Sequence, residues 1–238
     1  MQRSGSCRKR IVSSRLLIPL PSDTVSRTRI KICGLTCSED VRCAILAGVD
    51  AIGMVFYASS PRYVTADRAS ALAALVPPFV TRVGLFVNEE PATVRNVMTI
   101  VPMELLQFHG DEDDAYCRQF QKPFIKAARV KPGDDLVKFA ASFPSARALL
   151  LDAYVEGYGG GGKLFDWAQI PPKLSLAIIL SGGLQPENVG AAIRTVRPWA
   201  VDVSSGVESA KGIKDPLKIA AFVAAVKNAD VQPSLQLS

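Results

Sequence analysis

The sequence predicts a single-domain α/β protein, a (β/α)8 or TIM barrel formed by residues 29–230. Its 238 residues are 48% hydrophobic and 21% charged, which is typical of a globular protein. Short apolar or β-branched runs alternate with amphipathic stretches, and eight such pairs fit into about 200 residues. This alternation implies parallel strands joined by right-handed crossovers, and eight such units close into a barrel.

The eight expected strands are short runs bounded by turn residues. They span 29–33, 50–56, 81–87, 104–108, 123–128, 147–152, 175–181 and 199–203. Residues that commonly open helices stand between them. The expected starts are Ser38, Thr65, Asn88 or Glu89 ahead of Pro91, Asp111, Pro186 in the first turn of its helix, and Asp215 ahead of Pro216. The alternative, a doubly wound open sheet, normally has fewer units and a G-x-G-x-x-G motif after its first strand. This chain has Cys33-Gly34-Leu35-Thr36 there instead.

The ends of the chain differ from the barrel in composition. Residues 1–30 hold seven Arg or Lys and one Asp, a net charge of +6, which is also the charge of the whole chain. The remainder is therefore neutral, which argues against a nucleic-acid partner. We expect 1–28 to be a flexible basic extension, either from a start codon placed too far upstream or as an organelle transit peptide, and 231–238 to be a C-terminal tail.

Composition also limits the compartment and the partners. No apolar run approaches the roughly 18 residues that span a bilayer, so no membrane partner is expected. Five cysteines without disulfide spacing favour a reducing compartment. We expect the cytoplasm, or an organelle if the N-terminal extension targets the chain to one. The single histidine argues against a multi-histidine metal site.

Alternation along the strands predicts a thiol and a carboxyl group in the mouth of the barrel. If Ile30 and Ile32 pack against helices, Lys31 and Cys33 point inward, with Cys33 at the carboxyl-terminal rim. The same parity turns Asp152 inward at the end of the sixth strand. Alone, the cysteine could be a small buried apolar residue and the aspartate a helix cap. Together they form a candidate acid–base pair, since a thiolate can remove a proton from carbon and a protonated carboxyl group can supply one to oxygen.

Glycine-rich turns after the last two strands predict a phosphate site. Gly182 and Gly183 follow the seventh strand, and Ser205 and Gly206 follow the eighth. Barrels of this kind often bind phosphate between these two loops, where glycine lets backbone N–H groups approach an anion. We therefore expect a phosphorylated small-molecule ligand.

Three further polar residues are expected at the rim. Arg62, after the second strand, offers a fork for a carboxylate or lies on a solvated loop. Gln107 and His109 share one face of the fourth strand, where they either orient a ligand or are structural. Residues 159–164 are dense in glycine but lack the P-loop order, and we interpret them as a mobile lid.

Motifs in every unit make the chain resemble one family. They are KICGLT (31–36), SPRY (60–63), VGLFVN (83–88), QFHG (107–110), LLD (150–152), GKLFDW (162–167), LSGGL (180–184) and DVSSGVE (202–208). Together, from residue 29 to about 228, they resemble the phosphoribosylanthranilate isomerases of tryptophan biosynthesis. Two departures are Gly-Gly-Gly-Gly-Lys-Leu at 159–164, where the family usually has Gly-x-Gly-Lys-Thr, and Phe108 in place of a more usual Leu.

The resemblance implies a cofactor-free Amadori rearrangement of N-(5-phosphoribosyl)anthranilate, an aldose-to-ketose change that opens the ribose ring. It matches Cys33 to the general base that removes the C2 proton and Asp152 to the general acid that protonates the ring oxygen. It matches Arg62 to the group that holds the anthranilate carboxylate, and the two glycine loops to the phosphate grip. The assembly it implies is a monomer or a homodimer.

The implied chemistry needs unusual protonation states. A free thiol has a pKa near 8.5 and a free aspartic acid one near 4, so both would be in the wrong form at neutral pH. Local fields, with Lys31 as one source, must favour the Cys33 thiolate, and apolar surroundings must keep Asp152 protonated, at least once the ligand is bound.

Three rival interpretations can be weighed against this one. The related histidine-pathway isomerase catalyses a similar reaction, but that family has an aspartate where this chain has Cys33. A barrel that binds a phosphorylated metabolite without converting it would carry the same loops. A metal-dependent epimerase is disfavoured by the lone His109.

Overall fold

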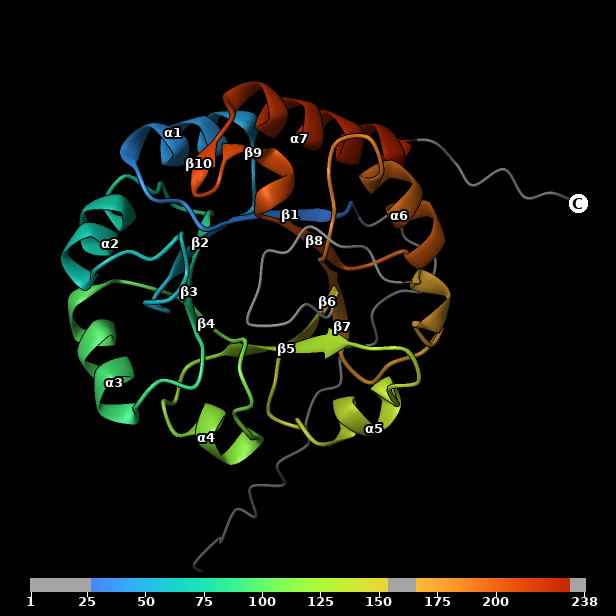
Figure 1. Ribbon diagram of the computed structural model, residues 1–238, viewed down its shortest axis with the longest axis horizontal. Coiled ribbons are helices and arrows are strands. Elements are labelled where there is room, and N and C mark those ends of the chain that lie inside the picture. The colour runs from blue at the N-terminus through green and yellow to red at the C-terminus, as the bar shows by residue number, and fades with distance from the viewer. Residues whose placement is uncertain (1–26, 154–165, 232–238) are drawn as a thin grey trace, which may run out of the picture.

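A closed barrel of eight parallel strands forms the centre of the protein (Figure 1). The computed structural model describes residues 27–153 and 166–231. The strands follow one another around the barrel in chain order, and β8 pairs with β1 to close it. They are β1 (Arg29–Cys33), β2 (Ala51–Val55), β3 (Thr81–Phe86), β4 (Leu105–Phe108), β5 (Phe124–Val130), β6 (Ala148–Ala153), β7 (Ala177–Leu180) and β8 (Ala200–Val203). The predicted barrel is confirmed, with each strand within two residues of its expected bounds.

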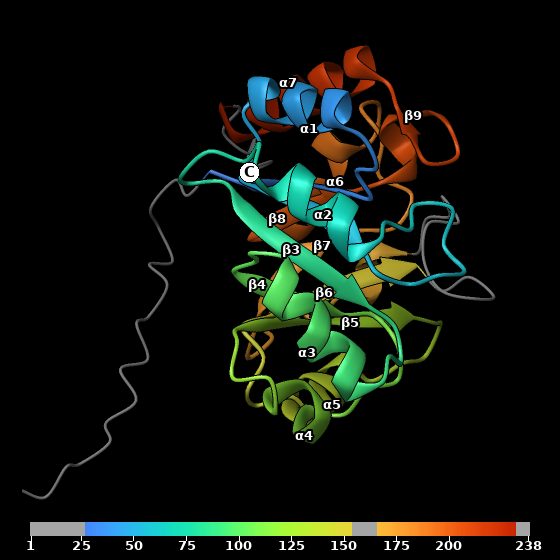
Figure 2. The same cartoon turned by 90° about the vertical axis from the view of Figure 1, so that its left-hand side faces the viewer.

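Helices surround the barrel on the outside, as Figures 1 and 2 show from two directions. They are α1 (Ser38–Ala47), α2 (Ala66–Ala73), α3 (Pro91–Ile100), α4 (Asp114–Arg118), α5 (Leu136–Ala141), α6 (Val189–Val196) and α7 (Pro216–Val231). The described residues form these seven α-helices. Between β6 and β7 they form only the short 3₁₀ helix η1 (Trp167–Gln169), because Pro171 and Pro172 follow at once and proline cannot continue a helix.

Two helices begin as the sequence predicts. The hydroxyl oxygen of Thr65 accepts a hydrogen bond from the Arg68 N–H at 3.3 Å and so caps α2. Pro216 opens α7, directly after Asp215. A third helix begins close to its expected start, because α1 starts at Ser38 but the residue in the capping position is Cys37.

Helix α3 begins at Pro91 as expected, with Glu90 in place of Asn88 or Glu89 as its cap, whereas the predicted starts of α4 and α6 are wrong by two or three residues. Helix α3 is preceded by Glu90, α4 by Asp113 and α6 by Asn188. Asn88 and Asp111, two of the residues expected to open helices, instead link the loops in which they lie. The Asn88 side chain accepts a hydrogen bond from the Asp111 N–H at 2.7 Å. Likewise, Pro186 lies in a turn ahead of α6.

Side chains alternate between the barrel interior and the helical layer as predicted. Ile30 and Ile32 belong to the large apolar cluster shared with the helices. Leu149 and Leu151 pack with residues of α5. Cys33 lies instead among apolar residues at the ends of β2 and β3. The parity argument that places a thiol and a carboxyl group in the mouth of the barrel therefore holds.

After β8 the chain forms a small structure that the sequence does not predict. A short 3₁₀ helix, η2 (Ser205–Val207), leads into an antiparallel hairpin of β9 (Glu208–Ala210) and β10 (Ile213–Lys214). Its turn lies against the loop after β2, since a Cβ on Gly212 would lie 2.7 Å from the Pro61 carbonyl oxygen. The hairpin thereby brings two charged residues, Glu208 and Lys214, to the rim.

The two ends of the chain lie largely outside the described residues. This applies to the predicted extension and tail, apart from residues 27, 28 and 231, and to the predicted lid at 159–164. Thr28 is buried, and its N–H and hydroxyl groups donate to the two carboxylate oxygens of Asp230 at 2.8 and 2.7 Å. The last described residue, Val231, is still part of α7.

Candidate active site

The candidate acid and base come from two strands that are separated in the barrel by β7 and β8. Cys33 is the last residue of β1 and Asp152 the penultimate residue of β6. Both are at the carboxyl ends of their strands, and both are buried, with 5% and 8% of their surface exposed. The barrel thus holds one thiol and one carboxyl group at the rim where such folds carry their chemistry.

A buried ion pair lies below the thiol. The Lys31 ammonium group contacts Asp202 of β8, with 2.8 Å between Nζ and Oδ1. On the neighbouring strand β2, a Cβ at Gly53 would lie 2.7 Å from the Cys33 Sγ and 3.2 Å from the Lys31 Cε. The absence of a side chain at Gly53 therefore makes room for both the sulfur and the lysine.

Burial and nearby lysines act in opposite directions on the ionisation of the thiol. Burial raises the pKa of Cys33, while the charges of Lys31 and Lys214 lower it and that of Asp202 raises it. The net direction is upward. Lys31 thus acts in the predicted sense, but its effect is smaller than the cost of burying a thiolate. The raised pKa favours the protonated thiol at neutral pH in the protein without ligand, and the thiolate expected in the bound state stays a prediction.

Gln107 and His109 lie beside Asp152. The His109 Nε2 is 3.2 Å from the Asp152 Oδ2, and the His109 Nδ1 is 3.1 Å from the Gln107 Nε2. All three side chains are buried. The sequence predicts both residues as ligand contacts or structural residues, and the structure shows them in contact with the candidate acid.

Arg62 lies in a buried charge cluster that sequence analysis missed. Its Nε and Nη2 donate to the two carboxylate oxygens of Glu208 at 2.7 and 2.8 Å. The Lys214 ammonium group lies 2.8 Å from the same carboxylate and also donates to the Ser204 carbonyl oxygen at 3.0 Å. The arginine is therefore held in a fixed direction. Two of its five N–H groups bind Glu208, and a guanidinium can offer the others to a ligand.

The pKa values in this cluster follow from burial and pairing. Burial would raise the pKa of Glu208, but the hydrogen bonds and charges of Arg62 and Lys214 outweigh it and lower that pKa. Burial lowers the pKa of Lys214, and Glu208 offsets this only in part. Glu208 is therefore a carboxylate that holds Arg62 in place. It closes the DVSSGVE motif, so its position was visible in the sequence, whereas nothing in the hydrophobic pattern marks Lys214.

The two glycine loops meet. A Cβ at Gly206 would lie 1.8 Å from the Leu184 carbonyl oxygen, so the loop after β8 packs directly on the loop after β7. Gly182 and Gly183 have positive φ angles of 79° and 64°, which residues other than glycine rarely adopt. Ser205 begins η2 beside them. The residues predicted to bind phosphate thus lie together on one side of the rim.

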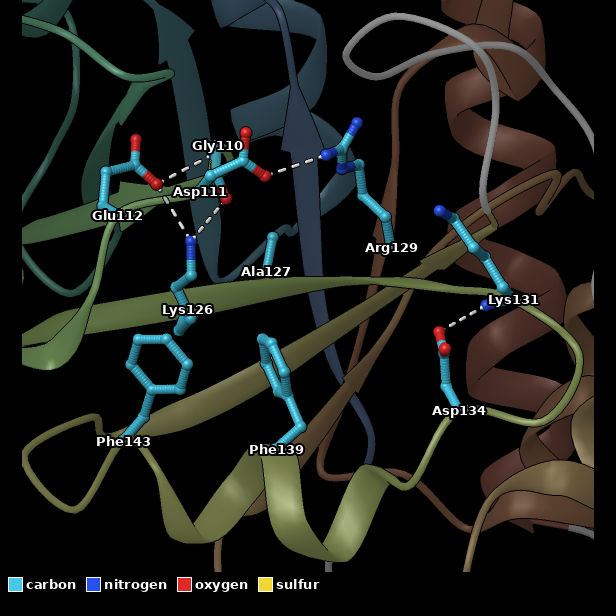
Figure 3. Close-up of a pocket in the computed structure, with 10 residues that line it drawn as sticks. All are labelled: Gly110, Asp111, Glu112, Lys126, Ala127, Arg129, Lys131, Asp134, Phe139 and Phe143. Atoms are coloured by element: carbon cyan, nitrogen blue, oxygen red, sulfur yellow. Dashed lines mark hydrogen bonds and ion pairs between the residues drawn. The ribbon is translucent and has the colours of Figure 1, made fainter.

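A separate cavity of about 340 Å³ lies between the loops after β4 and β5 and helix α5 (Figure 3). At its edge Lys126 donates to the Gly110 carbonyl oxygen at 2.7 Å and pairs with Glu112 at 2.9 Å. Figure 3 also shows Arg129 directed at Asp111, to which it is bonded at 3.0 Å. None of the predicted site residues lines this cavity.

The described residues contain neither a cluster of metal ligands nor a membrane-spanning helix. They contain no group of three or more His, Cys, Asp or Glu side chains that could hold a metal ion. Within residues 27–153 and 166–231, no helix is long and apolar enough to cross a membrane.

Comparison with known proteins assigns the chain to a family. The family model described as N-(5'phosphoribosyl)anthranilate (PRA) isomerase matches residues 30–225. A protein of that name from Dechloromonas aromatica is 65% identical over 204 residues, which cover 86% of this chain and 98% of the relative. The chain belongs to the phosphoribosylanthranilate isomerase family. The resemblance carried by the sequence motifs is thereby confirmed.

Solved phosphoribosylanthranilate isomerases share the fold. The enzyme from Thermotoga maritima is 42% identical, with a TM-score of 0.78, and covers 84% of this chain and 99% of its own. A second solved structure of a phosphoribosylanthranilate isomerase is 40% identical, with a TM-score of 0.75 and the same coverage. It is in complex with reduced 1-(o-carboxyphenylamino)-1-deoxyribulose 5-phosphate. Another structure concerns monomers made from the dimeric Thermotoga maritima protein.

Proposed function

We propose that this chain is an N-(5'-phosphoribosyl)anthranilate isomerase that acts in tryptophan biosynthesis by general acid–base catalysis. The observation that carries the mechanism is the position of Cys33 and Asp152, buried at the rim on different strands of one barrel. Family membership supports the substrate, a phosphorylated aminosugar with an aromatic carboxylate. The product is 1-(2-carboxyphenylamino)-1-deoxyribulose 5-phosphate, an isomer of the substrate.

The reaction begins with proton donation by Asp152. Its proton goes to the ribose ring oxygen, the bond between C1 and that oxygen breaks, and the electron pair of the bond stays on oxygen. The anthranilate nitrogen supplies its lone pair to C1 and becomes an iminium group. A carboxylic acid suits this step because it can deliver a proton to an oxygen as the bond to carbon breaks.

Cys33 then acts as the base. Its thiolate takes the proton from C2, and the electrons of the C–H bond form a C1–C2 double bond while the iminium charge is neutralised. The resulting enolamine moves a proton from the C2 hydroxyl group to C1 and becomes the ketose, so no atom is gained or lost. Because the resting thiol is protonated, Lys31 and Lys214 supply the positive charge that favours the thiolate when it forms.

The ends of the substrate are held by groups outside this pair. We infer that Arg62 binds the anthranilate carboxylate, which fits its fixed direction beside Glu208. The phosphate group is bound by the backbone of Gly182, Gly183, Ser205 and Gly206, where two glycine loops are packed together. Binding at both ends orients the sugar ring between acid and base.

We further propose a location in the cytoplasm, or in an organelle if residues 1–28 target the chain there, and a monomer or a homodimer as the assembly. The dimeric relative from Thermotoga maritima supports the second arrangement. Light scattering of the purified chain distinguishes the two assemblies.

A fluorescence assay that follows the consumption of phosphoribosylanthranilate tests the activity. Asp152→Asn keeps the shape of the side chain but has no acidic proton, and it should lower kcat about 10²–10⁴-fold. A loss of less than about threefold would remove Asp152 from its role.

Cys33→Ala should abolish the growth that the intact gene restores to a tryptophan auxotroph. Cys43→Ala, at a partly buried cysteine of α1, is the matched control and should support growth. If Cys33→Ala also supports growth, the thiol is not the base. If the unaltered gene does not restore growth, the chain binds a metabolite without converting it or acts on another phosphosugar.

A further inference from the structure

We propose that Gln107 and His109 are positioning residues that place the acidic proton of Asp152 on Oδ1, the carboxyl oxygen available to the substrate. The inference deepens the proposed isomerase and rests on the role of Asp152 as its acid. It concerns which oxygen of the Asp152 carboxyl group carries the proton. The amide direction of Gln107 determines the tautomer of His109, and that tautomer determines the position of the proton on Asp152.

The three side chains form a chain of contacts inside the barrel mouth. Gln107 belongs to β4, His109 follows that strand directly, and Asp152 belongs to β6. The two links are 3.1 Å and 3.2 Å long, and the three residues are 0%, 6% and 8% exposed. Bulk water therefore competes little for these contacts, and the donor and acceptor roles within the chain depend on one another.

The amide of Gln107 determines the histidine tautomer. Its Nε2 faces the His109 Nδ1, and because an amide NH₂ group only donates, Nδ1 must carry a lone pair. The proton of a neutral imidazole is then on Nε2, which faces the Asp152 Oδ2. This oxygen accepts a hydrogen bond, so a proton on the carboxyl group belongs on Oδ1.

The surroundings of Oδ1, the other carboxyl oxygen of Asp152, agree with this assignment. A Cβ at Gly182 would lie 2.9 Å from Oδ1, so a residue with a side chain there would crowd this oxygen. Gly182 starts the loop that we propose to bind the phosphate of the same substrate. Oδ1 thus lies toward the ligand side, whereas Oδ2 lies toward His109.

The opposite amide direction would misplace the proton. If the Gln107 oxygen faced Nδ1, that nitrogen would carry the proton and Nε2 would become an acceptor. The acidic proton would then be drawn to Oδ2 and held against His109. The direction with Nε2 toward His109 leaves the Gln107 Oε1 buried with no hydrogen-bond partner among the described residues. A buried oxygen without a partner is unfavourable, and we infer that the site retains it because this direction keeps Oδ1 acidic.

Nitrogen-15 NMR tests the tautomer in the unaltered protein. The chain has a single histidine, so its imidazole signals belong to His109 without further assignment. The proposal predicts that the proton of the neutral imidazole is on Nε2. A proton on Nδ1, or a doubly protonated ring, would overturn it whether or not the protein is active.

Gln107→Glu reverses the direction of the hydrogen bond between the side chain of residue 107 and the His109 Nδ1. A carboxylate accepts from Nδ1–H, so the NMR signals should change to the Nδ1–H or the doubly protonated form. We expect kcat to fall at least about tenfold while KM changes less than about threefold, because substrate binding is retained and only the acid is misdirected. Gln121→Glu makes the same charge change at an exposed position and should alter neither constant. A changed tautomer with unchanged kcat would overturn the proposal.

A second pair of variants separates positioning from packing. His109→Gln can present an amide N–H near the place of Nε2, whereas His109→Leu cannot, and neither should change the fold measured by circular dichroism. The glutamine variant should retain at least about tenfold more kcat than the leucine variant. Equal losses would mean that His109 only fills space. Inactivity of the unaltered protein would refute the proposed function and leave the NMR result as a test of the hydrogen-bond arrangement.

Discussion

Cys33 combines two requirements that oppose each other. It is buried, which raises the pKa of its thiol, yet a base in this position must lose its proton before it can take one from carbon. Lys31 and Lys214 oppose the effect of burial without cancelling it. The active fraction of the enzyme should therefore be the minor, ionised fraction at neutral pH.

The pH dependence of the rate follows from this. Because the pKa of Cys33 is raised, its thiolate fraction increases throughout the range from pH 7 to 9. In Asp152→Asn, which has no acidic proton to lose over that range, the residual kcat/KM should rise with the thiolate fraction. In the unaltered enzyme the rise should be smaller, because the reaction also needs the proton of Asp152. Measurement of kcat/KM against pH for both proteins tests this. A profile of Asp152→Asn that is flat from pH 7 to 9 contradicts it.

Individual site residues differed in how far the sequence could predict them. Strand parity was sufficient for Cys33 and Asp152, because the side chains of a strand must alternate between two faces. The link between Arg62 and Glu208 joins residues 146 positions apart through the ends of two long side chains, and no local pattern encodes such a contact. The same holds for the chain from Gln107 through His109 to Asp152.

At the scale of elements, the strands were predictable, whereas the helix starts were predictable only in part. The strands are continuous apolar runs because both of their faces are buried. A capping residue has other possible partners in three dimensions. The Asn88 backbone N–H donates to Glu112 at 2.7 Å, and Glu112 also accepts from Gly110, so residues near these helix starts join two loops. Propensity at a loop cannot distinguish a cap from such a link.

The hairpin of β9 and β10 is the element that fixes Arg62, the residue that we propose binds the substrate carboxylate. It carries Glu208 and Lys214 to Arg62, and Glu208 accepts two hydrogen bonds from the guanidinium group. Fixing an arginine before the ligand arrives reduces the conformational entropy that binding must remove. The hairpin thereby supports the proposed binding of the substrate carboxylate by Arg62.

Glu208→Gln should therefore weaken binding more than catalysis. An amide NH₂ group replaces one oxygen that accepts from Arg62, so one of the two hydrogen bonds is lost and the guanidinium group is no longer fixed. We expect KM to rise about tenfold, equivalent to about 1.4 kcal/mol, with kcat within about threefold. Glu187→Gln, at an exposed residue, is the control. A fall in kcat with unchanged KM would show that Glu208 serves the chemical step instead.

For the whole molecule, the fold could be predicted because the barrel repeats one simple pattern eight times. Short apolar runs and helical stretches in strict alternation leave few arrangements of a chain this long. The irregular parts were outside that pattern. They are the 3₁₀ helix between β6 and β7, the hairpin after β8, and the contacts that hold the first strand to the last helix. These depend on particular prolines, glycines and distant side chains.

The closure of the barrel gives a stability prediction. Thr28, ahead of β1, donates two hydrogen bonds to Asp230 near the end of α7, and thereby ties the two ends of the described barrel together. Asp230→Ala leaves the buried Thr28 N–H and hydroxyl groups without this acceptor, so the free energy of unfolding should fall by about 1–3 kcal/mol. Chemical denaturation followed by circular dichroism measures this change.

The same substitution should not affect catalysis, because Thr28 lies at the opposite end of β1 from Cys33. Asn228→Ala removes a side chain from an exposed position of the same helix, and should change the free energy of unfolding by less than about 0.5 kcal/mol. If Asp230→Ala is as stable as Asn228→Ala, the contact does not contribute to closure. If it is destabilised and kcat at 25 °C also falls, the two ends of the barrel are coupled, and the division between a stabilising end and a catalytic end is wrong.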